Sequence, residues 1–166
     1  MPTGKNRVPM AQLREILSEA GFMNVKTWIQ SGNVVLDTTL PSKVVERKIH
    51  NLIKENIGAD LAIVARTNKQ LQHMLDNIPF GNGYDLSRIF FTLFAEKPSS
   101  DKAAELMNID FEEEKLIVDG DKAYSYIPGN AARSKLSNNM LEKRLGIAAT
   151  TRNFNTMSKM VELSSR

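Results

Sequence analysis

The chain contains no cysteine among its 166 residues. This absence excludes a disulfide framework and thiolate metal sites, and it is typical of proteins in a reducing compartment. Only two histidines occur, His50 and His73, and they lie in separate predicted helices. Because a histidine metal site needs several such ligands close together, we predict no metal and no cofactor.

Long apolar runs are also missing. No segment approaches the ~18 apolar residues that a membrane-spanning helix needs, and the N-terminal sequence MPTGKNRVPM is too polar for a signal peptide. Apolar residues make up 42% of the chain and charged residues 25%, which is ordinary for a globular protein. We therefore predict a cytoplasmic protein with no membrane partner.

The charge is modest in total and uneven along the chain. The formal net charge is +3. Residues 129–166 carry seven Lys or Arg and two Asp or Glu, a net charge of +5, whereas residues 1–128 carry a net charge of −2. This asymmetry indicates either an anionic partner for the C-terminal part or a solvated basic face.

The spacing of apolar residues predicts alternating helices and strands along the whole chain. Gly21, Gly58 and Gly146 mark helix ends, and Asp119-Gly120 marks a tight hairpin. The predicted helices are 10–20, 42–57, 68–78, 98–107, 134–145 and 153–163, and the predicted strands are 25–30, 33–37, 61–65, 88–94, 115–118, 123–127 and 147–150.

This order predicts an α+β protein made of two similar halves. Residues 88–152 read β-α-β-β-α-β, the ferredoxin-like unit, and residues 1–66 read α-β-β-α-β, the same unit without its first strand. We expect a linker region at 67–87 that contains a helix, and a terminal helix at 153–163. We expect residues 1–166 to form a single domain that contains both halves.

Three stretches resemble an uncharacterised bacterial family known as domain of unknown function 1697. They are GKNRVPMAQLREILSEAGFMNVKTWIQSGNVV at residues 4–35, RSKLSNNMLEKRLG at 133–146 and ATTRNFNTMSKMVEL at 149–163. The resemblance implies a cytoplasmic bacterial protein with two ferredoxin-like halves. It brings no established activity, substrate or cofactor.

The sequence departs from the pattern of that family in three places. The family usually begins with an apolar strand before the residues that match Lys5-Asn6. Either the start of the chain is misassigned, or the sheet of the first half lacks its first strand. It often has Trp where Phe154 stands, and glycines near Ala131-Ala132. The last departure removes the residues best suited to a positive φ in that loop.

A first candidate site combines two polar stretches of the second half. Strand directions in a βαββαβ unit place both at one end of the sheet, about 10 Å apart at ~4.8 Å per strand, and each at a predicted helix N-terminus. Helix N-termini attract anions, and basic side chains add charge. The alternative is that Ser134 and Asn153 are plain helix caps, which would explain both residue types fully. The candidate residues are Arg133, Ser134, Lys135, Thr151, Arg152, Asn153 and Asn155.

A second candidate cluster lies in the first half. The same rule of strand direction brings the loop before the first helix next to the hairpin turn, although a simple turn beside a helix start would give the same pattern. The residues are Lys5, Asn6, Arg7, Gln30, Ser31 and Asn33. No histidine lies in either cluster, so the sequence predicts no general base.

These patterns leave three functions open. The first is a binding module for a phosphate-bearing ligand, either a nucleotide or a nucleic acid. The second is an enzyme acting on a phosphorylated small molecule, with Arg133, Lys135 and Arg152 on the phosphate. The third is a structural or partner-binding protein, a monomer or weak homodimer, that uses an open sheet edge.

Overall fold

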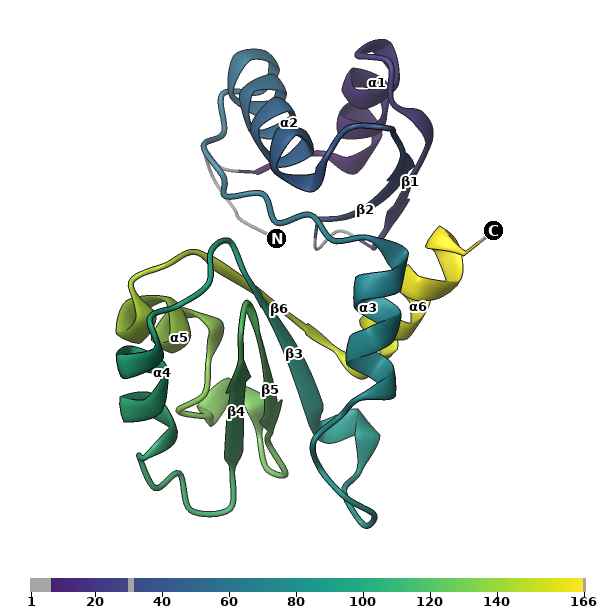
Figure 1. The fold of residues 1–166 in the computed structure, drawn as a ribbon. Coiled ribbons are helices and arrows are strands. Elements are labelled where there is room, and N and C mark those ends of the chain that lie inside the picture. The colour runs from purple at the N-terminus through teal and green to yellow at the C-terminus, as the bar shows by residue number, and fades with distance from the viewer. Residues whose placement is uncertain (1–6, 30–31, 166) are drawn as a thin grey trace. The chain divides into compact units, whose positions relative to one another are not determined.

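The computed structural model describes residues 7–29 and 32–165 (Figure 1). Helices and strands are both abundant, which confirms an α+β protein. The chain divides into two compact units, Met1–Gln72 together with Lys159–Arg166, and His73–Ser158. The first division falls inside helix α3 (Asn68–Asp76) and the second inside helix α6 (Phe154–Ser164).

In the first unit, which also includes the start of α3 and the end of α6, two helices pack on a hairpin. Pro9 and Pro41 stand directly before its helices, where their extended backbone leads into the first turn. Gly21 follows the first helix with φ +100°, a conformation that favours glycine. The elements are α1 (Met10–Glu19), β1 (Met23–Trp28), β2 (Asn33–Asp37) and α2 (Ser42–Asn56).

The core of the first unit lies between the hairpin and the two helices. Strands β1 and β2 are antiparallel, with Thr27 opposite Val34 and Trp28 opposite Asn33. An Arg14 side chain from α1 donates to the Thr27 hydroxyl, which places Thr27 on the helix-covered face. The buried core residues are Val8, Met10, Leu13, Leu17, Phe22, Val45, Ile49, Ile53 and Ala59.

The predicted strand at 61–65 is wrong. These residues pack their apolar side chains on the same core but form no strand. A side chain replaces a strand partner there, because the backbone N–H of Ala65 donates to Glu46 Oε2 at 2.8 Å. In a βαββαβ sheet the last strand pairs with the first, and within the described residues the first unit has only β1 and β2.

The second unit contains a four-stranded sheet. Ser99 and Ser137 cap its two helices, each accepting a hydrogen bond from the backbone N–H three residues later. The elements are β3 (Ile89–Phe94), α4 (Ser100–Met107), β4 (Lys115–Asp119), β5 (Lys122–Tyr126), α5 (Asn138–Leu145) and β6 (Ala149–Asn153), with short 3₁₀ helices at Leu86–Arg88 and Ala131–Arg133.

The strand order is β4-β5-β3-β6, and every neighbouring pair is antiparallel. Helices α4 and α5 cover one face (Figure 1), packing on Phe94, Leu116 and Ala123. On the other face, Phe91 contacts the rings of Tyr124 and Phe154 at centroid distances of 5.8 and 6.3 Å. The sheet is therefore buried on both sides near its centre, while β4 and β6 form its edges.

The predicted start of the helix at Ser134 is also wrong. Helix α5 begins at Asn138, and Ser137 is its cap. The Ser134 hydroxyl instead accepts from the backbone N–H of Leu136 at 2.9 Å. This turn lets Leu136 reach the core, where it is only 2% exposed.

Candidate functional site

The structure separates the two stretches of the first predicted cluster. The Ser134 hydroxyl donates to Glu114 Oε1 at 2.7 Å, which ties this residue to the start of the edge strand β4. Asn153 ends β6, at the opposite edge, and lies opposite Phe90. Three strand spacings of ~4.8 Å give a separation of about 14 Å across the sheet rather than the expected 10 Å.

Asn153 acts as a helix cap, as one interpretation of the sequence predicted. Its Oδ1 accepts from the backbone N–H of Thr156 at 2.9 Å at the start of α6. Thr151 and Arg152 lie inside strand β6, not in a helix start. Asn155 is exposed on the first turn of α6.

Thr151 belongs to a chain of hydrogen bonds that fixes α5 to the sheet. Its hydroxyl donates to Asn138 Oδ1 at 2.9 Å, so the Thr92 hydroxyl must donate to Thr151, at 2.8 Å. Asn138 Nδ2 in turn donates to the Ala149 carbonyl at 2.9 Å. Each side chain has a structural partner, so Thr151 is accounted for without a ligand.

The three basic residues of this cluster differ in exposure. Arg133 and Lys135 are exposed in the loop before α5. Arg152 is half-buried, and its guanidinium donates to Thr150 Oγ1 at 2.6 Å and to the Thr151 carbonyl at 3.0 Å. Burial lowers the pKa of Arg152 below its ordinary value. Arg133 and Lys135 therefore face solvent, whereas Arg152 is held by residues of its own strand.

The second predicted cluster is described only in part. Lys5, Asn6, Gln30 and Ser31 lie outside the described residues. Arg7 is exposed, and Asn33 is 5% exposed with its Nδ2 donating to the Trp28 carbonyl at 3.2 Å. Asn33 thus closes its own hairpin.

A groove of about 630 Å³ between α4 and α5 is a candidate site. Apolar side chains form its floor and charged or amide side chains form its rim. One wall comes from α4 and the residues after it, and the other from α5. The lining residues are Lys102, Glu105, Leu106 and Ile109 on the first wall, and Asn139, Met140, Lys143 and Arg144 on the second.

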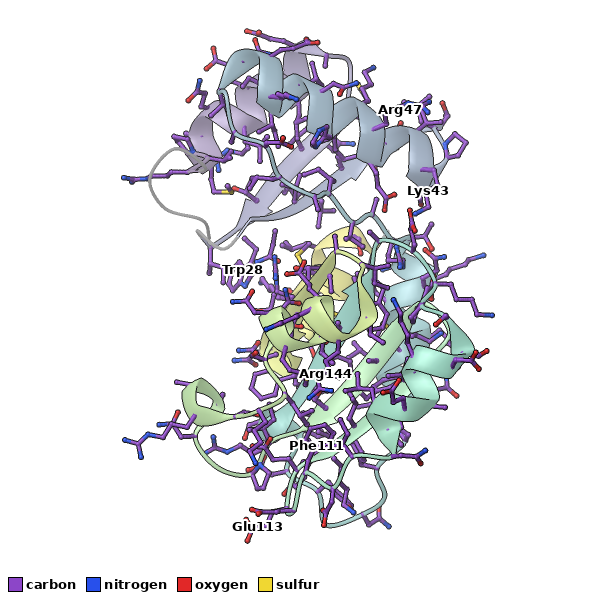
Figure 2. The ribbon with its side chains drawn as sticks, turned by 90° about the vertical axis from the view of Figure 1, so that its left-hand side faces the viewer. Trp28, Lys43, Arg47, Phe111, Glu113 and Arg144 are labelled. Atoms are coloured by element: carbon purple, nitrogen blue, oxygen red, sulfur yellow. The ribbon has the colours of Figure 1, made fainter. Side chains whose placement is uncertain are left out.

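Helical spacing explains why these side chains share the groove. Asn139 and Lys143 are four residues apart on α5, as are Met140 and Arg144, so each pair lies on one side of the helix. Figure 2 marks Arg144 on α5. Lys102 leans from α4 toward the end of α5, because a Cβ on Gly146 would lie 3.4 Å from Lys102 Nζ.

The groove carries a net positive charge. Within the described parts of the chain, Lys102, Lys143 and Arg144 form no ion pair and no side-chain hydrogen bond. Glu105 is the acidic residue of the lining. Three cations against one carboxylate, above an apolar floor, suit a ligand with an anionic group and an apolar body.

The described residues contain no cluster of three or more His, Cys, Asp or Glu side chains that could hold a metal ion. In the same residues, we find no helix that combines the length and the apolar character of a membrane span.

Comparison with known proteins places the chain in a family. Residues 2–124 match the family described as protein of unknown function (DUF1697). The chain belongs to this family. A conserved bacterial protein from Streptococcus pneumoniae has a similar fold, with a TM-score of 0.71 over 98% of this chain and 92% of that one, at 21% sequence identity. No curated protein matches the chain.

The sequence of this DUF1697 member did not predict the groove, because its basic residues lie far apart along the chain. Lys143 and Arg144 belong to the segment with a net charge of +5, and that signal was visible. Lys102 lies some forty residues earlier, in a region of opposite net charge. Only the packing of α4 beside α5 brings the three cations together.

Proposed function

We propose that this protein is a binding module for a phosphate-bearing ligand, a nucleotide or the backbone of a nucleic acid, and that the α4–α5 groove is its site. One observation carries the proposal: Lys102, Lys143 and Arg144 converge on one groove without ionic partners among the described residues. Ion pairing with phosphate would satisfy all three.

The size and lining of the groove agree with a small ligand. A volume of about 630 Å³ falls within the roughly 300–1,000 Å³ of typical ligand pockets. Leu106, Ile109 and Met140 offer an apolar surface for a base or another flat apolar group, and Asn139 offers an amide at the rim.

The fold supports this reading by analogy only. We infer that the second unit is a ferredoxin-like domain, because it has the element order β-α-β-β-α-β and the strand order β4-β5-β3-β6. Domains of this class often bind nucleic acids on an open sheet face. The groove lies instead between the helices that cover the sheet, so the analogy supports the ligand class and not the position of the site. The likeness to a bacterial protein supports the expected bacterial origin.

Binding should be measured with two probes, a fluorescent ATP analogue and a labelled single-stranded RNA, at several salt concentrations. The variant Lys143→Ala/Arg144→Ala removes two charges from the groove. The matched control Arg133→Ala/Lys135→Ala removes two from the exposed loop of the same unit. We expect the groove variant to weaken binding about tenfold or more, since contacts to charged groups contribute ~1.5–3 kcal/mol each before screening.

The controls separate the possible results. Loss confined to the loop variant would move the site to Arg133 and Lys135. Equal loss in both variants would indicate non-specific attraction, and no binding of either probe at low salt would refute the proposal.

A further inference from the structure

The edge strand β4 directs backbone groups away from the sheet, and no other strand of the described residues pairs with them. It pairs with β5 on one side only, with Ile117 opposite Tyr124 and Val118 opposite Ala123. The N–H of Val118 donates to Met107 Sδ at 3.3 Å, so it points away from β5. Because N–H directions alternate along a strand, the N–H and C=O of Leu116 also point to the free edge.

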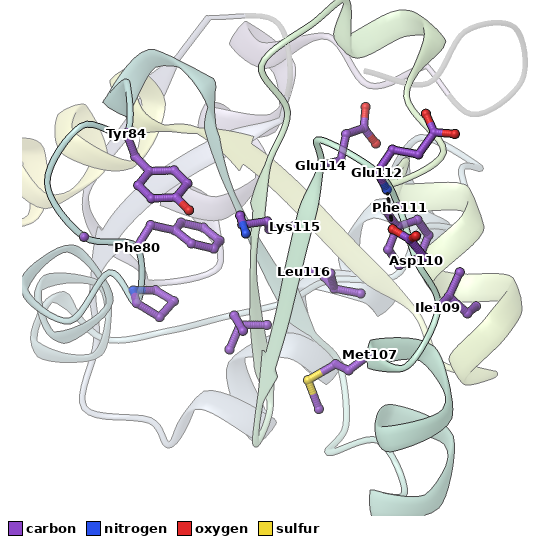
Figure 3. A pocket seen from close by; sticks show the side chains of 13 residues that line it. Phe80, Tyr84, Met107, Ile109, Asp110, Phe111, Glu112, Glu114, Lys115 and Leu116 are labelled. Carbon is purple, nitrogen blue, oxygen red and sulfur yellow. Dashed lines mark hydrogen bonds between the residues drawn. The ribbon is translucent and has the colours of Figure 1, made fainter.

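Open space lies along this edge. A hollow of about 470 Å³ is lined by Leu116 and Ile117 of β4, by Phe80 and Tyr84 on one side and by residues 109–112 and 114 on the other (Figure 3). Ile117 is 38% exposed. An exposed apolar residue on an unpaired edge is unusual in a monomer, since such edges invite pairing with another strand.

The sequence of β4, Lys-Leu-Ile-Val-Asp, is complementary to itself in one antiparallel register. If Ile117 faces Ile117 of a second copy, Leu116 faces Val118 and both direct their backbone groups at each other. Lys115 then faces Asp119, twice per pair. A register centred on Leu116 would instead place Glu113 opposite Asp119, a repulsive contact.

We propose that β4 is a homodimerisation edge, and that two copies of the chain join their four-stranded sheets through antiparallel β4–β4 pairing centred on Ile117. The backbone bonds are two Leu116–Val118 exchanges, and the Lys115–Asp119 pairs fix the register. Each pair adds a second cation to a carboxylate that already lies 3.8 Å from Lys122 Nζ of its own hairpin. Val118 gives up its thioether acceptor, which is weak, for a carbonyl oxygen. This surface does not depend on the phosphate-binding proposal.

Charge exchange tests the register. Sedimentation equilibrium from about 10 µM to 1 mM should show a reversible dimer of the unchanged protein. Lys115→Asp places two carboxylates opposite each other on both sides of the axis, and Asp119→Lys does the same with ammonium groups, so each should weaken association about tenfold. The double variant Lys115→Asp/Asp119→Lys should restore it. A monomer at every concentration, or a double variant as weak as the single ones, would overturn the proposal.

Crosslinking gives an independent measurement, because the chain has no cysteine of its own. Ile117→Cys should form an intermolecular disulfide on mild oxidation, since opposed residues of a non-hydrogen-bonded pair lie ~4.5 Å apart at Cα. Leu86→Cys, at another exposed apolar position (46% exposed), is the matched control. Equal crosslinking of the two variants would contradict β4 pairing and favour random collision.

Discussion

Both units pack two helices on an antiparallel sheet, but the sheet has two strands in the first unit and four in the second within the described residues. In the second unit, β6 pairs with the first strand, β3, and five residues enter the ladder. In the first unit, residues 61–65 (Leu-Ala-Ile-Val-Ala) are more apolar than β6 (Ala-Thr-Thr-Arg-Asn) and pack on the core, yet they remain outside any strand. The difference teaches that strand propensity is realised only where a neighbouring strand supplies hydrogen-bond partners.

In the first unit, side chains of α2 supply part of the hydrogen bonding that a neighbouring strand would supply. Glu46 is 9% exposed and accepts from the Ala65 N–H at 2.8 Å. It also lies 3.9 Å from the Arg66 guanidinium and 3.2 Å from Lys43 Nζ. His50 Nδ1 lies 2.7 Å from the Leu61 carbonyl oxygen. Helix α2 thus fixes residues 61–65 through side-chain hydrogen bonds, in place of a neighbouring strand.

The largest effect is expected from removing that support. Glu46→Ala should lower the free energy of unfolding by about 1.5–3 kcal/mol, because a buried charged acceptor is lost and the Ala65 N–H loses this bond. Urea denaturation measures the change, and hydrogen exchange should accelerate at Ala65. Glu46→Gln keeps an oxygen acceptor, so its loss should be smaller. Equal stability of both variants and the unchanged protein would show that the contact is dispensable.

A second prediction concerns the second unit at high pH. Burial, assisted by the nearby negative charge of Asp119, raises the pKa of Tyr124 to about 12 from 10. The unfolded chain therefore loses this proton first, so stability should be complete below pH 10 and fall as the pH rises from 10 to 12. Tyr124→Phe should flatten this decline in thermal melts, whereas Tyr84→Phe should not. A decline that is the same in all three proteins would contradict the assignment.

The smallest effect is expected at Ser125. Its hydroxyl is buried and has no hydrogen-bond partner among the described residues. Ser125→Ala should be neutral or stabilising by up to about 1 kcal/mol, because an unsatisfied polar group is removed. Thr92→Val, which removes a hydroxyl that does have a partner, should destabilise. A clear loss of stability in Ser125→Ala would reveal a partner for this hydroxyl.

Local signals in the sequence determined much of the fold. Pro9, Gly21 and Gly146 bound helices as their backbone preferences require, and the Asp119-Gly120 hairpin forms as predicted. Asn153 caps the last helix. These features depend on one residue and its immediate neighbours, so no tertiary information is needed to predict them.

Tertiary structure alone decided that residues 61–65 form no strand, where α5 begins and which residues line the groove. Ser134 resembles a helix cap in sequence, but its contact with Glu114 and the burial of Leu136 move the helix start to Asn138. Lys102 meets Lys143 and Arg144 only because α4 and α5 pack side by side on one face of the sheet. Residues far apart in the sequence form each of these features: a strand pair, a long-range hydrogen bond and a groove between helices. The spacing of apolar residues along the chain does not predict such contacts.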